Sequence, residues 1–185
     1  MQYLIVSGNS EQNSVCHSIL QEVLRGAADG GAEAKALSLE GIGRCKACND
    51  DAGICRTEHR CAFGKDGFDE VQEMTKQSDA LCIITQVGWN EMAECVKNFL
   101  ERLRRCENGM IGSLAGKPIL VVMSPDGSGN GLLACMEQID RFCRQTGAVI
   151  FDYLNVNRWN NDYQKVSAYA AARSMAYGRK AGEIS

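Results

Sequence analysis

The chain has 185 residues, of which 45% are hydrophobic and only two are proline, a composition that suits one compact domain rather than a disordered chain. The net charge of −3 and the pI near 5.5 give no reason to expect a nucleic-acid partner. No stretch reaches the roughly 18 apolar residues of a membrane span, and the first residues lack the pattern of a signal peptide, so we expect a cytoplasmic protein.

The chain begins with a predicted strand, a polar turn and a helix. Residues 3–6 (YLIV) form the short apolar run typical of a parallel strand covered on both faces. A polar loop follows, and from Val15 onward apolar residues recur at helical spacing. Backbone N–H groups at a helix start favour an anion, most often a phosphate. The alternative is a plain strand-to-helix turn. The candidate phosphate-binding residues are Gly8, Asn9, Ser10, Asn13 and Ser14.

A second strand and an unusually long loop follow this helix. The strand is predicted over 32–39, and the next helix over 66–78. The loop between them, residues 41–65, is longer than compact domains usually allow without a functional reason. A short buried strand (ALCIIT) is predicted at 80–85.

The second half of the chain continues the alternation of strand, loop and helix. The remaining predicted elements are a helix from the end of loop 86–91 to about Arg105, strand 117–123, loop 124–131, helix 132–146, strand 148–154 and helix 161–180. Two loops in this half follow strands and carry polar and glycine residues. Their candidate ligand-binding residues are Val87, Gly88, Trp89, Asn90 and Glu91 in the first and Asp126, Gly127, Ser128 and Gly129 in the second.

Five strands that alternate with five helices predict a three-layer, doubly wound α/β fold with a five-stranded parallel sheet. We expect a single domain over 1–185, because nothing in the sequence resembles a linker. The first, third and fourth strands all end in loops rich in glycine, serine and asparagine. Ligands of open α/β sheets bind at the carboxyl ends of the strands. The sequence therefore predicts a ligand site at this edge.

The ten cysteines fall into two groups. Six lie within predicted helices or strands, where cysteine behaves as a small buried hydrophobe: Cys16, Cys82, Cys95, Cys106, Cys135 and Cys143. The other four crowd the polar loop 41–65: Cys45, Cys48, Cys55 and Cys61. In a reducing compartment such a cluster is usually metal-binding or redox-active. Four thiolates suit a 4Fe-4S cluster or a tetrahedral zinc ion, and free or redox-paired thiols are the third reading.

The order and spacing of these loops resemble the flavodoxin-like NAD(P)H-dependent FMN reductases, and especially their cysteine-bearing branch, the iron–sulfur flavoproteins. SGNSEQNS stands where that family has its G-S-x-R-x-x-S phosphate loop, and TQVGWNEMAECVKNFLERL where it has P-x-Y-x-G and L-K-x-F-x-D-R. MSPDGSGNG stands for the glycine-rich loop beside the flavin ring, and RCKACNDDAGICRTEHRC for the cysteine cluster.

The resemblance implies strand order 2-1-3-4-5, bound FMN, and electrons passed from NAD(P)H through the flavin to an unknown acceptor. In the cysteine-bearing branch a 4Fe-4S cluster would take part. The resemblance also implies a homodimer or homotetramer, with the cysteine loop of one subunit near the flavin of another. No acid/base or nucleophilic set stands out, as expected where the cofactor carries the chemistry.

The chain departs from the family pattern in the loops that hold the flavin. Glu11 replaces the phosphate-contacting arginine, and Cys16 replaces a threonine at the helix start. The ring loop has Gln86 and Gly88 in place of the family's proline and tyrosine, although Trp89 still offers an aromatic face. These changes keep two alternatives open: a non-enzymatic module for metal binding or partner docking, and a one-electron carrier of the flavodoxin type.

Several candidate residues also have a plainer reading. Trp89 is equally well explained as a half-buried loop residue. Glu91 and Asp126 are expected to be carboxylates at helix starts, stabilised by the helix dipole. His17, in the first helix, and His59, in the cysteine loop, are expected to be ordinary surface histidines.

Overall fold

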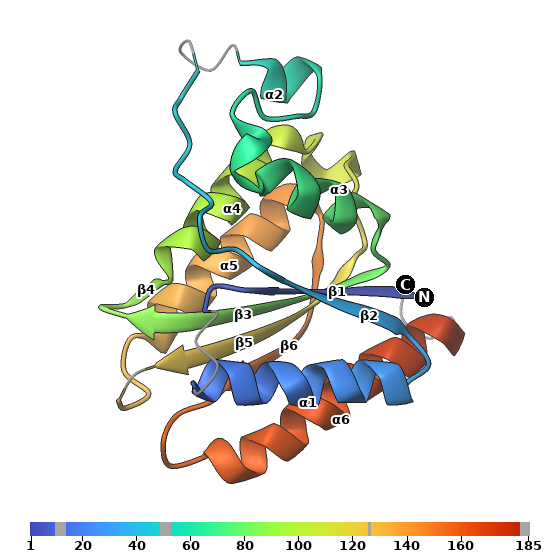
Figure 1. The fold of residues 1–185 in the computed structure, drawn as a ribbon, viewed down its shortest axis with the longest axis vertical. Coiled ribbons are helices and arrows are strands. Elements are labelled where there is room, and N and C mark those ends of the chain that lie inside the picture. The colour runs from blue at the N-terminus through green and yellow to red at the C-terminus, as the bar shows by residue number, and fades with distance from the viewer. Residues whose placement is uncertain (10–13, 49–52, 126, 182–185) are drawn as a thin grey trace.

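The computed structural model of the chain describes residues 1–9, 14–48, 53–125 and 127–181. Within them the sheet contains five parallel strands in the order β2-β1-β3-β5-β6 (Figure 1). The strands are β1 (Gln2–Ser7), β2 (Glu33–Ser38), β3 (Ala80–Gly88), β5 (Pro118–Pro125) and β6 (Val149–Asn155). Counted along the parallel path, this is the expected order 2-1-3-4-5. The predicted doubly wound α/β fold is confirmed.

A sixth, antiparallel strand corrects the prediction for residues 86–91. β3 continues to Gly88, beyond the predicted end at Thr85, and pairs with the two-residue strand β4 (Glu91–Met92). The segment expected to be a loop is therefore a tight hairpin. Its register places Val87 opposite Met92, and both side chains are buried, which holds the hairpin against the core.

Helices cover both faces of the sheet (Figure 1). One face carries α1 (Val15–Asp29) and α6 (Asn161–Ala181), and the other carries α3 (Phe68–Gln77), α4 (Glu94–Cys106) and α5 (Leu132–Thr146). These bounds lie within a few residues of the predicted ones, as is usual for helix ends. None of the helices in the described part of the chain is long and apolar enough to cross a membrane.

Alternation along the strands divides the core into two layers. In β1, Leu4 and Val6 pack with α3, α4 and α5, whereas Tyr3 and Ile5 pack with α1 and α6. This period of two is expected for a strand buried on both faces. On the second face, Gly26 of α1 lies so close to the Tyr169 carbonyl of α6 that a Cβ atom would have no room.

The long cysteine-bearing segment contains short helices rather than a continuous loop. Residues between β2 and α3 include α2 (Ile54–Thr57) and the 3-10 turn η1 (Gly64–Asp66), and a further 3-10 turn, η2 (Gly109–Ile111), follows α4. Figure 1 shows α2 near one end of α4, and β4 at the other. α4 thus connects the two regions in which the sequence places candidate sites.

Candidate functional site

Three loops meet at the carboxyl edge of the sheet, where β1 and β3 lie side by side. The chain leaves β1 toward β2 on one side and later returns to β3 on the other, so this is the point where the strand order reverses. Open α/β sheets bind their ligands at such a point. The Gly8 N–H donates to the Ile84 carbonyl at 3.0 Å, which fastens the first loop to β3.

The first loop also lies directly against the start of α4. A Cβ atom on Gly8 would come within 2.5 Å of Val96 Cγ2, a separation that real Cβ contacts do not show. The Cys95 thiol donates to the Gly8 carbonyl at 3.4 Å. Glycine is therefore required here because the backbone approaches the helix closely.

The tip of the β3–β4 hairpin has an unusual backbone. Trp89 (φ 50°) and Asn90 (φ 68°) both adopt left-handed conformations, which matches the two-residue type I′ turn that suits a hairpin. A bulky residue with positive φ is rare in ordinary turns and recurs at functional sites. The Trp89 side chain is 99% exposed, so it makes no contribution to the core and presents its aromatic face to solvent.

The hairpin tip contacts the third loop, residues 127–131. Gly131 (φ +86°) lies against Asn90, whose Oδ1 atom would be 2.6 Å from a Cβ at position 131. Within the loop the Asn130 N–H donates to Ser128 Oγ at 3.3 Å. The structure thus brings together the second and third of the predicted loops, whereas the first contacts β3 and the start of α4, the elements on either side of the second loop.

The residues predicted for the first loop have local roles where they are described. The Ser14 side chain caps α1 by accepting the His17 N–H at 3.1 Å. The Ser7 hydroxyl donates to the Asn9 carbonyl at 2.9 Å, and Asn9 N–H approaches the same hydroxyl at 3.3 Å. Ser10 and Asn13 lie outside the described residues, as do Glu11 and Asp126.

The structure corrects two expectations in the second loop. The prediction that Glu91 stands at a helix start is wrong, because Glu91 belongs to β4 and α4 begins at Glu94. Its carboxylate pairs instead with Lys97 Nζ at 2.7 Å. Trp89 is not a half-buried loop residue. Val87 and Gly88 belong to β3, and the Val87 side chain faces the core, so only its backbone is available to a ligand.

Most of the isolated cysteines are buried hydrophobes, as predicted. Cys16, Cys82, Cys135 and Cys143 are all buried. Burial raises the pKa of the Cys82 thiol and raises the pKa of Cys135 to about 11. Burial and the nearby Asp140 carboxylate raise the pKa of Cys143 to about 12. Thiols with such pKa values stay protonated and unreactive at neutral pH. Cys95 is only half-buried, and burial also raises the pKa of its thiol.

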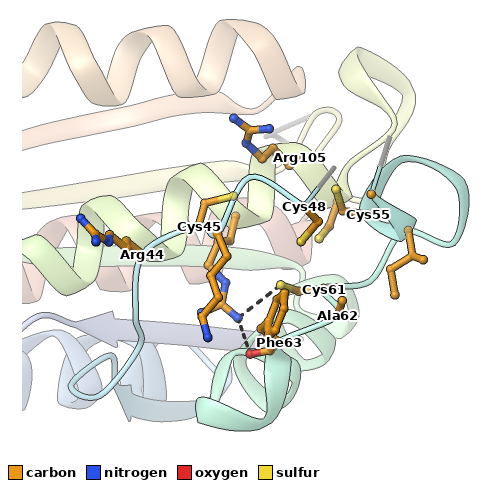
Figure 2. Close-up of a pocket in the computed structure, with 13 residues that line it drawn as sticks. Arg44, Cys45, Cys48, Cys55, Cys61, Ala62, Phe63 and Arg105 are labelled. Carbon is orange, nitrogen blue, oxygen red and sulfur yellow. Dashed lines mark hydrogen bonds between the residues drawn. The ribbon is translucent and has the colours of Figure 1, made fainter. Parts of the chain in front are cut away.

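The four loop cysteines line one pocket (Figure 2). Cys45, Cys48, Cys55 and Cys61 share it with the apolar side chains of Ile54 and Phe63 and with residues of α4. Cys106 of α4 also lines it, and burial, together with Cys61 and Cys55, raises the pKa of this fifth thiol to about 12. The donor set suits thiophilic metal, but among the described residues no three cysteine, histidine or acidic side chains are grouped closely enough to hold a metal ion.

Arg102 anchors the cysteine loop to α4. Its side chain is 2% exposed, and its Nη1 atom donates to Asp66 Oδ2 at 2.6 Å and to the Gly43 carbonyl at 3.0 Å. Its Nη2 atom donates to the Phe63 carbonyl at 2.9 Å and to Cys61 Sγ at 3.4 Å, both dashed in Figure 2. One guanidinium therefore holds both ends of the segment that carries the cysteines.

The electrostatics of Asp66 follow from this contact. Partial burial raises the pKa of Asp66, but hydrogen bonds from Arg102 and from the Gly43 N–H, with the positive charge of Arg102, outweigh it and keep the pKa below its ordinary value. The Arg102 guanidinium also lies 4.3 Å from the centre of the Phe68 ring, a favourable cation–π contact.

Sequence reasoning missed the roles of Arg102 and Asp66. In the sequence Arg102 stands close to Arg104 and Arg105 near the end of a predicted helix, where solvent-exposed cations are expected. Its position three residues after the buried Phe99 is the signal that could have found it, because that spacing turns both side chains toward the same side of the helix. Asp66 carries no such signal, since its partner lies far along the chain.

The histidines differ in their surroundings. His17 lies in the first turn of α1, where its Nε2 atom is 3.5 Å from Gln21 Nε2. His59 is half-buried and donates from Nδ1 to the Cys106 carbonyl at 3.1 Å. His59 is therefore a partly exposed residue with a fixed contact to α4, which the sequence does not predict.

The sheet order and the helices on both faces define a flavodoxin-like fold, a class in which ligands bind at the carboxyl edge of the sheet. The family model described as NADPH-dependent FMN reductase matches residues 1–161, and the chain belongs to this family. It is therefore an oxidoreductase of the type that uses FMN and a nicotinamide cofactor, which confirms the resemblance to the FMN reductases and sets aside the non-enzymatic docking module.

Solved structures agree on the fold. An archaeal flavodoxin is 13% identical over 97% of this chain and 99% of its own, with a TM-score of 0.66. An azoreductase from Bacillus anthracis str. Sterne is 12% identical over 96% and 99%, with a TM-score of 0.67. An NADH:FMN oxidoreductase in its apo form is 16% identical over 93% and 88%, with a TM-score of 0.64. A search of curated proteins returned no match.

Proposed function

We propose that the three loops at the carboxyl edge hold FMN and that the enzyme passes electrons from NAD(P)H through this flavin to an acceptor. The convergence of the loops carries the proposal: Gly8 lies against Val96, and Asn90 against Gly131, at the point where the strand order reverses. Bound FMN would supply the chemistry, by accepting a hydride from the nicotinamide and releasing electrons to the acceptor.

The residues present fit a flavin in one respect and depart from the family in another. Glycines at positions 8 and 131 let the backbone approach its neighbours closely, and the exposed Trp89 provides an aromatic surface beside the site. The phosphate would depend on backbone N–H groups and polar side chains of the first loop, because Glu11 replaces the family's arginine. We therefore expect FMN to bind more weakly than in a typical relative.

Titration with FMN tests this proposal. The purified chain is titrated with FMN, and the visible absorption of the protein fraction is recorded after the free flavin is removed. We expect a flavin spectrum, and we expect the loaded protein to oxidise a reduced nicotinamide when a quinone is supplied as acceptor. A chain that stays colourless at FMN concentrations well above those that saturate relatives would overturn the proposal.

The cysteine pocket supports a second proposal, that it holds a 4Fe-4S cluster. The observation that favours it is that four thiols line one pocket, with the Arg102 guanidinium beside Cys61 to offset negative charge. Because no three of the described ligating side chains are close enough for a metal ion in this structure, the thiols would have to draw together when the cluster binds. The competing alternatives are a bound zinc ion and a metal-free pocket whose thiols are free or redox-paired. Iron, zinc and acid-labile sulfide are measured on anaerobically purified protein and on a Cys48→Ser variant. We expect iron and sulfide in the first and a loss in the second. Zinc alone, or no metal, would contradict the cluster.

The position of the pocket bears on assembly. It adjoins Arg102, Arg105 and Cys106 at the end of α4, whereas Gly8 adjoins Val96 near its start. The 13 residues of this helix extend over about 20 Å. Within one subunit the pocket and the flavin loops would therefore lie far apart, and the proposal of a homodimer or homotetramer, which the resemblance implies, would place the pocket of one subunit near the flavin of another. Sedimentation of the loaded protein measures the oligomeric state.

A further inference from the structure

A basic hollow lies where the cysteine segment meets the end of α4. It has a volume of about 490 Å³ and is lined by Arg56, His59, Arg104, Arg105, Glu107 and Asn108. Three of these side chains are positively charged, in a chain whose net charge is −3. Arg105 also pairs with the Glu101 carboxylate at 3.4 Å. The one carboxylate that lines the hollow, Glu107, accepts hydrogen bonds from Ser113 Oγ (2.8 Å) and the Leu114 N–H (3.3 Å). The hollow is therefore suited to an anion.

The dipole of α4 explains the position of only some of these cationic side chains. Arg104 and Arg105 occupy the last turn of α4, where cations are favoured. Arg56 belongs to α2, and His59 follows it, so the dipole of α4 gives no reason for these residues to be there. The bond from His59 Nδ1 to the Cys106 carbonyl fixes the imidazole at this place. Two segments far apart in sequence thus supply cationic and polar groups to one cavity.

A groove leads from this hollow toward the hairpin at the carboxyl edge. It has a volume of about 260 Å³ and runs between α4 and α5, where it is lined by Met92, Lys97, Leu100, Glu101, Arg104, Gln138, Arg141, Phe142 and Gln145. Met92 belongs to the β3–β4 hairpin, and Arg104 lines both groove and hollow. From the start of α4 to Arg104 the helix rises by about 15 Å.

This arrangement suits an elongated ligand with a phosphate at its far end. Leu100 and Phe142 offer apolar surface, and Arg141 offers positive charge along the way, whereas Lys97 is paired with Glu91. Arginine side chains recognise phosphate through paired, charge-assisted hydrogen bonds. NADPH differs from NADH by one such group, the 2′-phosphate of the adenosine. A nicotinamide placed beside the hairpin would leave the adenosine end of the dinucleotide at the arginines.

We infer that Arg56, His59, Arg104 and Arg105 form the subsite for the 2′-phosphate of NADPH, and that the α4–α5 groove holds the rest of the dinucleotide. The inference rests on the proposed function, because it takes the nicotinamide end to lie beside the flavin loops. It makes the enzyme selective for NADPH over NADH, with the selectivity located far from the flavin.

Calorimetric binding of two nucleotides tests the subsite without any flavin. Adenosine 2′,5′-bisphosphate should bind the wild-type chain at least roughly tenfold more tightly than adenosine 5′-monophosphate, as expected for charge-assisted bonds to one added phosphate. The double variant Arg104→Gln/Arg105→Gln should remove this difference. Arg144→Gln is the matched control, because Arg144 is an exposed arginine of the neighbouring helix that lines neither cavity.

Three outcomes would overturn the inference. Equal affinity for the two nucleotides in the wild-type chain would show that the 2′-phosphate is not recognised. Inorganic phosphate that competes as well as the bisphosphate would indicate a general anion site. A preserved difference in a double variant whose circular dichroism matches the wild type would place the recognition elsewhere.

A kinetic comparison on FMN-loaded protein separates this inference from the proposed function. In the double variant the KM for NADPH should rise at least roughly tenfold while kcat, and the KM for NADH, stay close to wild type. A chain that fails to bind FMN yet still distinguishes the two nucleotides would refute the proposed function alone. A chain that binds FMN and uses both dinucleotides equally would refute the subsite alone.

Discussion

The two ends of α4 carry different kinds of site. At its start the contacts depend on glycines that let a backbone pack closely against its neighbours: Gly8 lies against Val96, and Gly131 against Asn90 of the hairpin tip. At its end the contacts are made by side chains, with Arg102 joined to Asp66 and Cys61. The first site depends on strand order and on the absence of Cβ atoms, and the second on individual charged groups and thiols.

This contrast shows what each region tolerates. A site built from backbone can change most of its side chains, as this chain has done at Glu11, Gln86 and Gly88, provided that the close approaches remain. A site built on one buried guanidinium depends on that group, because a buried charge or carbonyl left without its partner is costly. The predictions below test the contrast by changing one end of the helix at a time.

The largest effect is expected at Arg102. In Arg102→Leu the Asp66 carboxylate and two backbone carbonyls lose their donor, so the free energy of unfolding should fall by about 2–3 kcal/mol. Urea unfolding measures it. The loop cysteines should also react faster with a thiol reagent, while FMN affinity at the other end of α4 changes little. Arg144→Leu, on an exposed arginine, should stay within about 0.5 kcal/mol of wild type. Unchanged stability and unchanged thiol protection would contradict the anchoring role.

A smaller loss of stability is expected from Gly8→Ala. The added Cβ would meet Val96 Cγ2 and Ala93 Cβ, and such overpacking typically costs about 1–3 kcal/mol. FMN affinity should fall with it, whereas thiol reactivity of the cysteine loop should not change. Gly127→Ala is the control for stability, because a Cβ at that position meets open space. Adding Val96→Ala to Gly8→Ala should recover part of both losses, and a failure of this rescue would argue against the contact as the cause.

The smallest effect is expected from the titration of Asp66. The folded chain holds the pKa of this carboxyl below its ordinary value of 3.8, so its contribution to stability is present above about pH 4 and is lost as the pH falls through the lowered folded value. The difference in unfolding free energy between wild type and Asp66→Asn should therefore shrink as the pH is lowered from 6 to 3. A difference that stays constant over this range would show that the ion pair with Arg102 does not contribute.

The sequence contains enough to predict the fold and the edge at which the loops meet. The buried strands and amphipathic helices follow from hydrophobic period, and strand order then places Gly8 beside β3. The hairpin could not be predicted, because β4 has only two residues and because tryptophan is not a residue that marks a type I′ turn. The partner of Arg102 could not be predicted either, since Asp66 is separated from it by 36 residues and only tertiary packing brings the two together.

The exposure of the indoles has a practical consequence for spectroscopy. The chain contains only two tryptophans, and Trp89 is 99% exposed while Trp159 is 64% exposed. Their fluorescence therefore originates at the surface in the folded protein, and unfolding would move neither indole out of an apolar core. Replacing Trp159 by phenylalanine would leave Trp89 as the single tryptophan, so a change in emission on adding a ligand to that variant would report docking beside the hairpin.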